Sequence, residues 1–282
     1  MFRKKFFRLY KLILNKFLSN KGLEKYFILN KINNIIKSVV TPSYVIIDGH
    51  KIYLDKLDSL NLSTKGVHEP FETSIVKKYV SKGDTVLDIG ANIGYYTLLF
   101  ARIVGPLGKV YAFEPEPSTF KLLKKNISVN NYKNVCLVNK AVSDTESKIP
   151  FYVSKNNLGG HSIYKPDKGS SKTFVDAIIL DKYFNNDFKV DFIKIDIEGA
   201  EVKALKGMKN IIKRSPELKI LTEINPFMLS KSGTGVKELF DYITDLGFTF
   251  YLLDYKNNKL VKSDKNNIIK LKRCVNILLV KE

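Results

Sequence analysis

From residue 69 onward, short apolar segments rich in β-branched residues alternate with amphipathic helical segments. Adjacent parallel strands need a crossover connection, usually a helix, so this alternation predicts an α/β fold with a doubly wound, mostly parallel sheet. The pattern predicts strands at 85–89, 109–113, 135–139, 151–153, 191–195, 218–223, 249–254 and 275–280. It predicts helices at 71–80, 95–104, 117–130, 201–214 and 235–246. Only a polar loop joins the last two strands, so they are expected to pair antiparallel at one edge.

Residues 1–65 precede this alternation and are predicted to form an accessory segment, which leaves 66–282 as the main domain. Between positions 2 and 17 apolar residues recur at helical spacing with cations opposite, which predicts a basic amphipathic helix. A second helix is predicted at 23–37, followed by a β-hairpin through Asp48-Gly49. Two roles for the first helix stay open: contact of residues 2–18 with an anionic membrane surface, or packing against the chain's own domain.

The chain carries 47 Lys and Arg against 28 Asp and Glu, a formal charge of +19 over 282 residues. This charge suits nucleic acid, an anionic membrane or an acidic glycan equally well. No apolar run reaches the roughly 18 residues that a membrane span needs. The two cysteines, Cys136 and Cys274, lack the number and spacing of a disulfide framework, which favours a reducing, cytoplasmic location.

The loop after the first main-domain strand carries the sharpest cofactor signal. It contains Gly90, Ala91 and Gly94, where the backbone can bend and approach a ligand closely. A dinucleotide-binding loop would place glycine where this chain has Asn92. Asp88 precedes the loop, and its carboxylate would repel a phosphate but attract a cation. S-adenosylmethionine has a sulfonium and an ammonium group and no phosphate, so it is the predicted cofactor.

Two further segments lie where the same cofactor would extend. Glu114 follows the second strand, where its carboxylate is expected to accept hydrogen bonds from a ribose diol. The run Ala141-Val142-Ser143-Asp144 follows the third strand and is expected to flank the adenine. Glu114 would also suit a structural role at the start of a helix.

A second polar group follows the predicted central strand 191–195. A central parallel strand is normally apolar on both faces, so Lys194 and Asp196 predict a polar cleft at its carboxyl end. Methyl transfer to a hydroxyl needs a group that takes the proton. The candidate bases are Asp196, Glu198, Glu223 and, in the polar loop 154–172, His161. Glu223, Asn225 and Asp196 would also suit a divalent metal ion, a possibility that stays open.

Several of these motifs together resemble one protein family. They are His68-Glu69-Pro70, the run 86–97, Phe113-Glu114-Pro115, the run 141–144 and the run 192–201. They are similar to the FkbM family of S-adenosylmethionine-dependent methyltransferases. The resemblance implies a class I methyltransferase fold with seven strands, and O-methylation of sugar or natural-product hydroxyls. The candidate cofactor-binding residues are then Glu69, Asp88, Gly90, Ala91, Asn92, Gly94, Tyr95, Thr97, Glu114, Pro115, Ala141, Val142 and Asp196. The candidate catalytic residues are Asp196, Glu198, Lys194, Glu223 and His161.

The first hypothesis is therefore O-methylation of a glycan, a lipid-linked sugar or another small molecule. A nucleic-acid methyltransferase is the alternative that the charge suggests. Enzymes that methylate base amino groups usually carry an Asn-Pro-Pro-aromatic motif after the fourth strand, where this chain has Asp196-Ile197-Glu198-Gly199. A third hypothesis is a non-catalytic membrane-surface adaptor, which the intact cofactor motifs disfavour. No motif identifies the acceptor or the oligomeric state.

Overall fold

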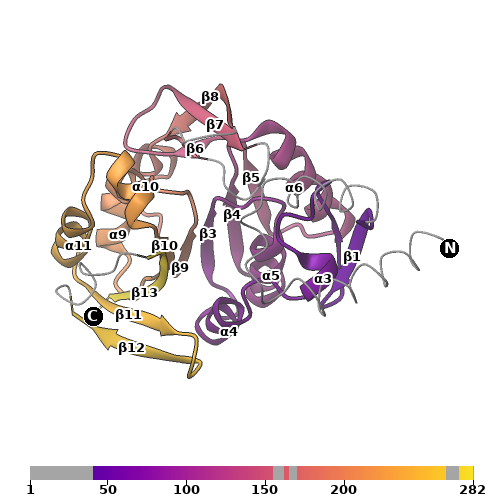
Figure 1. The fold of residues 1–282 in the computed structure, drawn as a ribbon. Helices are drawn as coiled ribbons and strands as arrows, with labels where there is room; N and C mark the ends of the chain where they lie inside the picture. Colours follow the sequence, from indigo (N-terminus) through magenta and orange to yellow (C-terminus); the bar gives the residue numbers. More distant parts are fainter. Residues whose placement is uncertain (1–40, 155–161, 165–169, 265–272, 282) are drawn as a thin grey trace.

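The computed structural model describes residues 41–154, 162–164, 170–264 and 273–281 (Figure 1). The two helices predicted at 2–17 and 23–37 lie outside these residues, so they stay predictions, as does the membrane contact assigned to them. No helix in the described part of the chain combines the length and the apolar character that crossing a membrane requires.

The main sheet contains eight strands in the order β12-β11-β13-β10-β9-β3-β4-β5. Their bounds are β3 Thr85–Ile89, β4 Lys109–Phe113, β5 Val135–Val138, β9 Phe192–Ile195, β10 Lys219–Ile224, β11 Phe248–Asp254, β12 Lys259–Ser263 and β13 Val275–Lys281. The five strands from β5 to β10 are parallel, and β13 runs antiparallel between β10 and β11. The predicted antiparallel pairing is confirmed.

The predicted count of seven strands needs a correction. The polar connection between β11 and β13 contains β12, which pairs antiparallel with β11 and forms the edge of the sheet. Its residues are mostly exposed or half-buried, because only one neighbouring strand covers it. A strand with so little apolar character gives no clear sequence signal.

Helices cover both faces of the sheet, as the alternation predicts. On one face lie α4 (Pro70–Tyr79), α5 (Tyr95–Val104) and α6 (Pro117–Val129), packed on side chains such as Val86 and Phe192. On the other lie α7 (Leu180–Tyr183), α8 (Glu201–Gly207), α9 (Lys209–Arg214) and α11 (Val236–Asp245), packed on Leu87 and Ile193. The short helix α10 (Pro226–Lys231), which was not predicted, follows β10.

The helix predicted at 201–214 is divided into α8 and α9. Gly207 at the end of α8 lies against the loop after β6, and a Cβ there would fall 2.0 Å from the carbonyl oxygen of Ser143. This close approach depends on a distant segment, so helical periodicity alone does not reveal it.

A second, three-stranded sheet has the order β6-β8-β7, with β6 at Ala141–Val142, β7 at Lys148–Ser154 and β8 at Ser170–Ile178. It lies at the top of the view in Figure 1. The predicted strand 151–153 is confirmed within the longer β7, whereas β8 was missed. Phe151 of β7 contributes to the same pocket as the loops after β3, β4 and β9, so the small sheet stands over the carboxyl edge of the main sheet.

The predicted hairpin is present as β1 (Tyr44–Ile47) and β2 (His50–Tyr53), with Asp48 and Gly49 both at positive φ in the turn. Two side chains at the end of α6 hold the hairpin. Asn126 Oδ1 accepts from the Tyr53 amide at 2.7 Å, and Oδ1 of Asn130, the residue that follows α6, accepts from the Lys51 amide at 2.9 Å. A single helical turn, α3 (Leu62–Lys65), leads from the hairpin toward α4.

Candidate functional site

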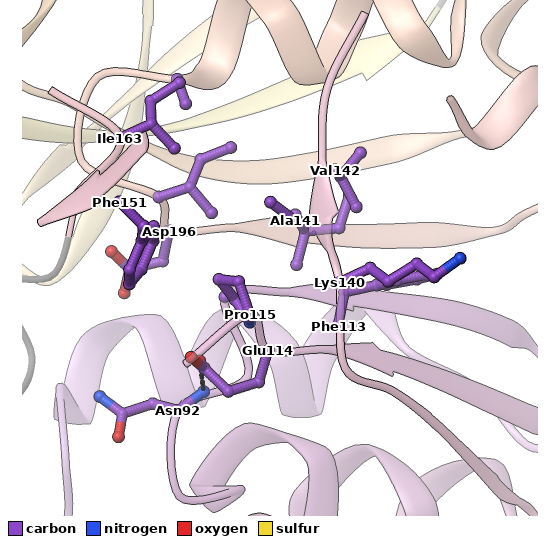
Figure 2. Close-up of a pocket in the computed structure, with 14 residues that line it drawn as sticks. Asn92, Phe113, Glu114, Pro115, Lys140, Ala141, Val142, Phe151, Ile163 and Asp196 are labelled. Carbon is purple, nitrogen blue, oxygen red and sulfur yellow. Dashed lines mark hydrogen bonds between the residues drawn. The ribbon is translucent and has the colours of Figure 1, made fainter. Parts of the chain in front are cut away.

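A pocket of about 620 Å³, part of it open to solvent, lies where β3, β4 and β9 end. Figure 2 shows Asn92, Glu114 and Asp196 around this opening, with Ala141 and Val142 of β6 facing them. Carboxyl ends of parallel strands are where α/β sheets bind ligands. The predicted cofactor residues that line the pocket are Gly90, Asn92, Glu114, Pro115, Ala141, Val142 and Asp196.

Glu114 is held at this opening by two backbone amides. Its Oε2 accepts from the Asn92 amide at 3.0 Å, and its Oε1 accepts from the Glu116 amide at 2.9 Å. Each carboxylate oxygen has a second lone pair, which stays available to a hydroxyl donor. Burial raises the pKa of Glu114 to about 7, although the two amides oppose this change.

The loop between β3 and α5 approaches β9 very closely. Gly90 has φ +86°, and a Cβ there would lie 2.0 Å from the carbonyl oxygen of Asp196. Asn92 also lies in the left-handed region, at φ +50°, and its own Oδ1 accepts from the Ile93 amide at 2.7 Å. The missing side chain at Gly90 therefore lets two strand ends form one wall of the pocket.

Asp88 lies beneath this loop and is not one of the residues that line the pocket. It is 1% exposed, and its Oδ2 accepts from Thr97 Oγ1 at 2.5 Å. Burial raises the pKa of Asp88 to about 6, against the lowering effects of Lys194 and Thr97. Among the described residues, the lining also omits the predicted cofactor residues Glu69, Ala91, Gly94, Tyr95 and Thr97.

Lys194 and Asp196 form an ion pair with a distance of 2.9 Å from Nζ to Oδ2. Lys194 is 6% exposed and its Nζ lies 4.6 Å from the centre of the Tyr96 ring. Burial raises the pKa of Asp196, but the charge and hydrogen bond of Lys194 outweigh burial and lower it. The Tyr96 hydroxyl in turn donates to Glu69 Oε2 at 2.9 Å, so this group connects α5, β9 and the start of α4.

Glu198 and Glu223 form the remaining acidic group. Glu198 lies in the left-handed region at φ +49°, and its Oε2 accepts from Asn225 Nδ2 at 3.4 Å. Burial, followed by the charges of Glu223 and Asp196, raises the pKa of Glu198 to about 7. Glu223 Oε1 accepts a hydrogen bond from the Cys274 thiol, and burial raises its pKa as well.

Two residues of this region were not predicted as site residues. His68 lies with its ring edge-on to Tyr95 and Tyr96, and its Nε2 is 3.6 Å from Glu69 Oε2. Burial lowers the pKa of His68. Glu201 Oε1 accepts from the Gly199 amide at 3.0 Å, and burial raises the pKa of Glu201 to about 8. The sequence offered one signal for each: His68 directly precedes Glu69, and Glu201 follows Glu198 by three positions. The predicted candidate base His161 lies outside the described residues.

The three oxygen donors considered for a metal ion are engaged by other groups. Asp196 Oδ2 pairs with Lys194, Glu223 Oε1 accepts from Cys274, and Asn225 Oδ1 accepts from the Met228 amide at 3.3 Å. In the part of the chain that the structure describes, no group of three or more His, Cys, Asp or Glu side chains is arranged to hold a metal ion. These residues therefore fit a metal site poorly.

Two family models match parts of this sequence. Residues 88–250 match the family described as Methyltransferase FkbM domain, and residues 15–146 match the protein-L-isoaspartate(D-aspartate) O-methyltransferase family. Methyltransferase 1 of Beauveria bassiana is 26% identical over 144 residues, which cover 44% of this chain and 57% of that protein. The hexuronic acid methyltransferase AglP of Haloferax volcanii is 30% identical over 130 residues, covering 46% of this chain and 52% of that protein.

The chain thus spans between half and three-fifths of the length of these relatives. Among solved structures, a SAM-dependent O-methyltransferase from Thermotoga maritima superposes with a TM-score of 0.43 at 14% identity, covering 87% of this chain and 81% of that one.

Proposed function

Because the chain belongs to the FkbM family of S-adenosylmethionine-dependent methyltransferases, we propose that it methylates a hydroxyl oxygen of a glycan, a lipid-linked sugar or another small molecule. S-adenosylmethionine is the cofactor of this family, and when bound it supplies an electrophilic methyl group on a sulfonium. The chain itself must hold the cofactor, orient the acceptor and receive the hydroxyl proton.

The pocket at the ends of β3, β4 and β9 suits this cofactor. Glu114 offers free lone pairs on two oriented oxygens, which fits a ribose diol. Gly90 leaves room for close approach of a ligand to the backbone. Ala141 and Val142 give an apolar surface that suits an adenine ring. Asp88 acts from behind the loop, where its buried carboxyl and Thr97 fix the end of β3.

The observation that carries the proposal is the acidic group at the ends of β9 and β10, where Glu198 lies near Glu223 and its Oε2 accepts from Asn225 Nδ2 at 3.4 Å. A general base works best when its pKa is near the working pH, and the pKa of Glu198 is about 7. Asp196 is a weaker candidate because Lys194 lowers its pKa. We assign Glu198 as the base, and Lys194 with Asp196 as the pair that fixes the adjacent end of β9.

The charges around this carboxyl support an uncharged acceptor group. Glu69, Asp88 and Glu223 interact with the charge of Lys194, which is already paired with Asp196. The Glu198 carboxyl faces the negative charges of Glu223 and Asp196. A phosphodiester beside the reacting oxygen would be repelled there, although the chain as a whole carries +19. AglP, whose name specifies a hexuronic acid, supports a sugar as the acceptor class.

The test is transfer of a tritiated methyl group from S-adenosylmethionine to a panel of neutral glycosides, lipid-linked sugars, free uronic acids and RNA. The proposal expects base-stable label in a neutral glycoside or lipid-linked sugar, because an ether survives mild alkali and an ester does not. Label in RNA alone would favour the nucleic-acid alternative. Label released by mild alkali would indicate methylation of a carboxyl group.

A further inference from the structure

Ser162 joins the small sheet to the turn that follows β9. Backbone hydrogen bonds pair Ser162 with Tyr152 of β7, at 2.7 Å in one direction and 3.2 Å in the other. The Ser162 hydroxyl donates to the carbonyl oxygen of Glu198 at 2.8 Å and accepts from the Tyr164 amide at 3.0 Å. Ser162 is 2% exposed, so these protein partners replace water around its polar groups.

The turn that Ser162 contacts has an unfavourable backbone. Glu198 has φ +49° and Gly199 has φ +93°. The left-handed region disfavours any residue with a Cβ, so Glu198 keeps this conformation only if its surroundings hold it. Glu201 Oε1 accepts from the Gly199 amide at 3.0 Å, and the backbone of Met228 lies so close that a Cβ on Gly199 would be 2.9 Å away. Ser162 adds a hydrogen bond to the Glu198 carbonyl.

This turn decides which groups surround the Glu198 carboxyl. The Glu198 carboxyl is faced by Glu223 at the end of β10, by Asp196 at the end of β9 and by Asn225 at the start of α10. The Cys274 thiol before β13 and the Glu201 carboxyl of α8 also interact with its charge. We propose that Ser162 is a positioning residue: its hydroxyl holds the left-handed turn and thereby keeps the Glu198 carboxyl between Glu223 and Asn225. The catalytic meaning of this contact rests on the proposed role of Glu198, whereas the positional claim does not.

Removing the hydroxyl has a consequence that can be measured without an acceptor. If the turn relaxes, the Glu198 carboxyl moves away from Glu223 and gains water, so its pKa falls from about 7 toward the ordinary glutamate value of 4.5. The cofactor-side contacts of Glu114 involve other loops and should not change.

The experiment compares S162A with S162T, which keeps a hydroxyl, and with S74A. Ser74 is exposed on α4, and its hydroxyl donates to the Phe71 carbonyl at 2.7 Å, so S74A removes a similar bond far from the turn. The Glu198 carboxyl is titrated by carbon-13 NMR, with its signal assigned by its loss in E198Q. We expect S162A to lower this pKa by about one unit or more, with S162T and S74A close to the wild type.

Two further measurements distinguish a positioning role of Ser162 from a general disruption of the fold. S162A should lower turnover roughly tenfold to 100-fold when it is measured at saturating S-adenosylmethionine. A wild-type titration of Glu198 in S162A, or equal effects of S162A and S162T, would overturn the proposal. If S162A does not fold, S162C keeps the volume with a weaker donor and should give a smaller shift in the same direction. If the wild type methylates no hydroxyl, the proposed function fails, but the titration still decides the positional claim.

Discussion

The backbone amide of Asn92 donates to Glu114 Oε2 across 3.0 Å, so the loop after β3 directly fixes the carboxylate that follows β4 (Figure 2). The Glu116 amide fixes the other oxygen. Both donors are backbone groups in well-packed loops, which makes Glu114 an oriented acceptor before any ligand arrives.

The first prediction concerns this acceptor. In E114Q one carboxylate oxygen becomes an NH₂ group, which opposes a backbone amide and cannot accept from a ribose hydroxyl. We expect S-adenosylmethionine and S-adenosylhomocysteine binding to weaken by about 1–3 kcal/mol, roughly 5- to 150-fold. Titration calorimetry measures this, with E217Q on the exposed Glu217 as the charge-matched control. Wild-type affinity in E114Q would exclude Glu114 from the cofactor site.

The second prediction tests why residue 90 is glycine. G90A places a Cβ against the Asp196 carbonyl at φ +86°, whereas G83A has a similar φ of +90° with nothing within 4 Å. Both variants carry a backbone strain of about 1 kcal/mol. The difference between their free energies of unfolding therefore measures the clash at residue 90, which we expect to be about 1–3 kcal/mol. Urea denaturation should show G90A as the less stable variant, and only G90A should lose cofactor binding. Equal destabilisation would mean that the loop can move away from β9.

Local signals predicted the centre of the fold well. The bounds of β3, β4 and α5 match the prediction, because each is an apolar segment that ends at glycine or an acidic residue. Elements whose stability comes from distant partners were missed. β8 and β12 are largely polar on their exposed faces, and the break between α8 and α9 lies next to the close contact of Gly207 with Ser143.

The candidate site shows the same division. Glycine and carboxylate spacing indicated the loop at Gly90 and the side chain of Glu114, and both line the pocket. The position of Asp88 behind the loop and the contact of Glu223 with Cys274 arise from sheet register and from the antiparallel β13. The spacing of residues in the sequence contains neither the sheet register nor this strand pairing. It therefore could not rank Asp196, Glu198 and Glu223 as candidate bases.

The third prediction concerns stability and pH. Burial raises the pKa of Glu201 to about 8 in the folded chain, against the ordinary glutamate value of 4.5. The folded state therefore holds a proton that the unfolded state has lost, and stability falls as pH rises through this range. His50 and His68, whose pKa values burial lowers, act in the opposite direction only below about pH 6.5. Between pH 6.5 and 8 the cofactor-free protein should become less stable.

E201Q tests the source of this loss. The amide carries no charge at any pH in this range and keeps an oxygen for the Gly199 amide. The decline in unfolding free energy should become shallower by on the order of 1 kcal/mol per pH unit. Urea denaturation at pH 6.5 and 8 measures it, with E217Q parallel to the wild type. Identical slopes in E201Q and the wild type would place the titration elsewhere.

The fourth prediction concerns metal dependence. Lys194, Cys274 and the Met228 amide already engage the oxygens of Asp196, Glu223 and Asn225. Dialysis against EDTA should therefore leave methyl transfer within roughly twofold of its starting rate. Loss of activity that magnesium restores would show that these side chains rearrange around an ion.

The last prediction concerns the proposed base. The rate of methyl transfer should rise with pH through about 7, where Glu198 loses its proton. E198Q removes that proton acceptor, so turnover should fall by roughly 100- to 10,000-fold with little change in cofactor affinity.

Substitution of two neighbours of Glu198 should move the midpoint of the pH–rate profile in opposite directions. E223Q removes a negative charge that raises the pKa of Glu198, so the midpoint falls. N225S keeps a cap for α10 but removes the Nδ2 donor that favours the carboxylate, so the midpoint rises. If the pH–rate profiles of E223Q and N225S shift in the same direction, or do not shift, a group other than Glu198 accepts the hydroxyl proton.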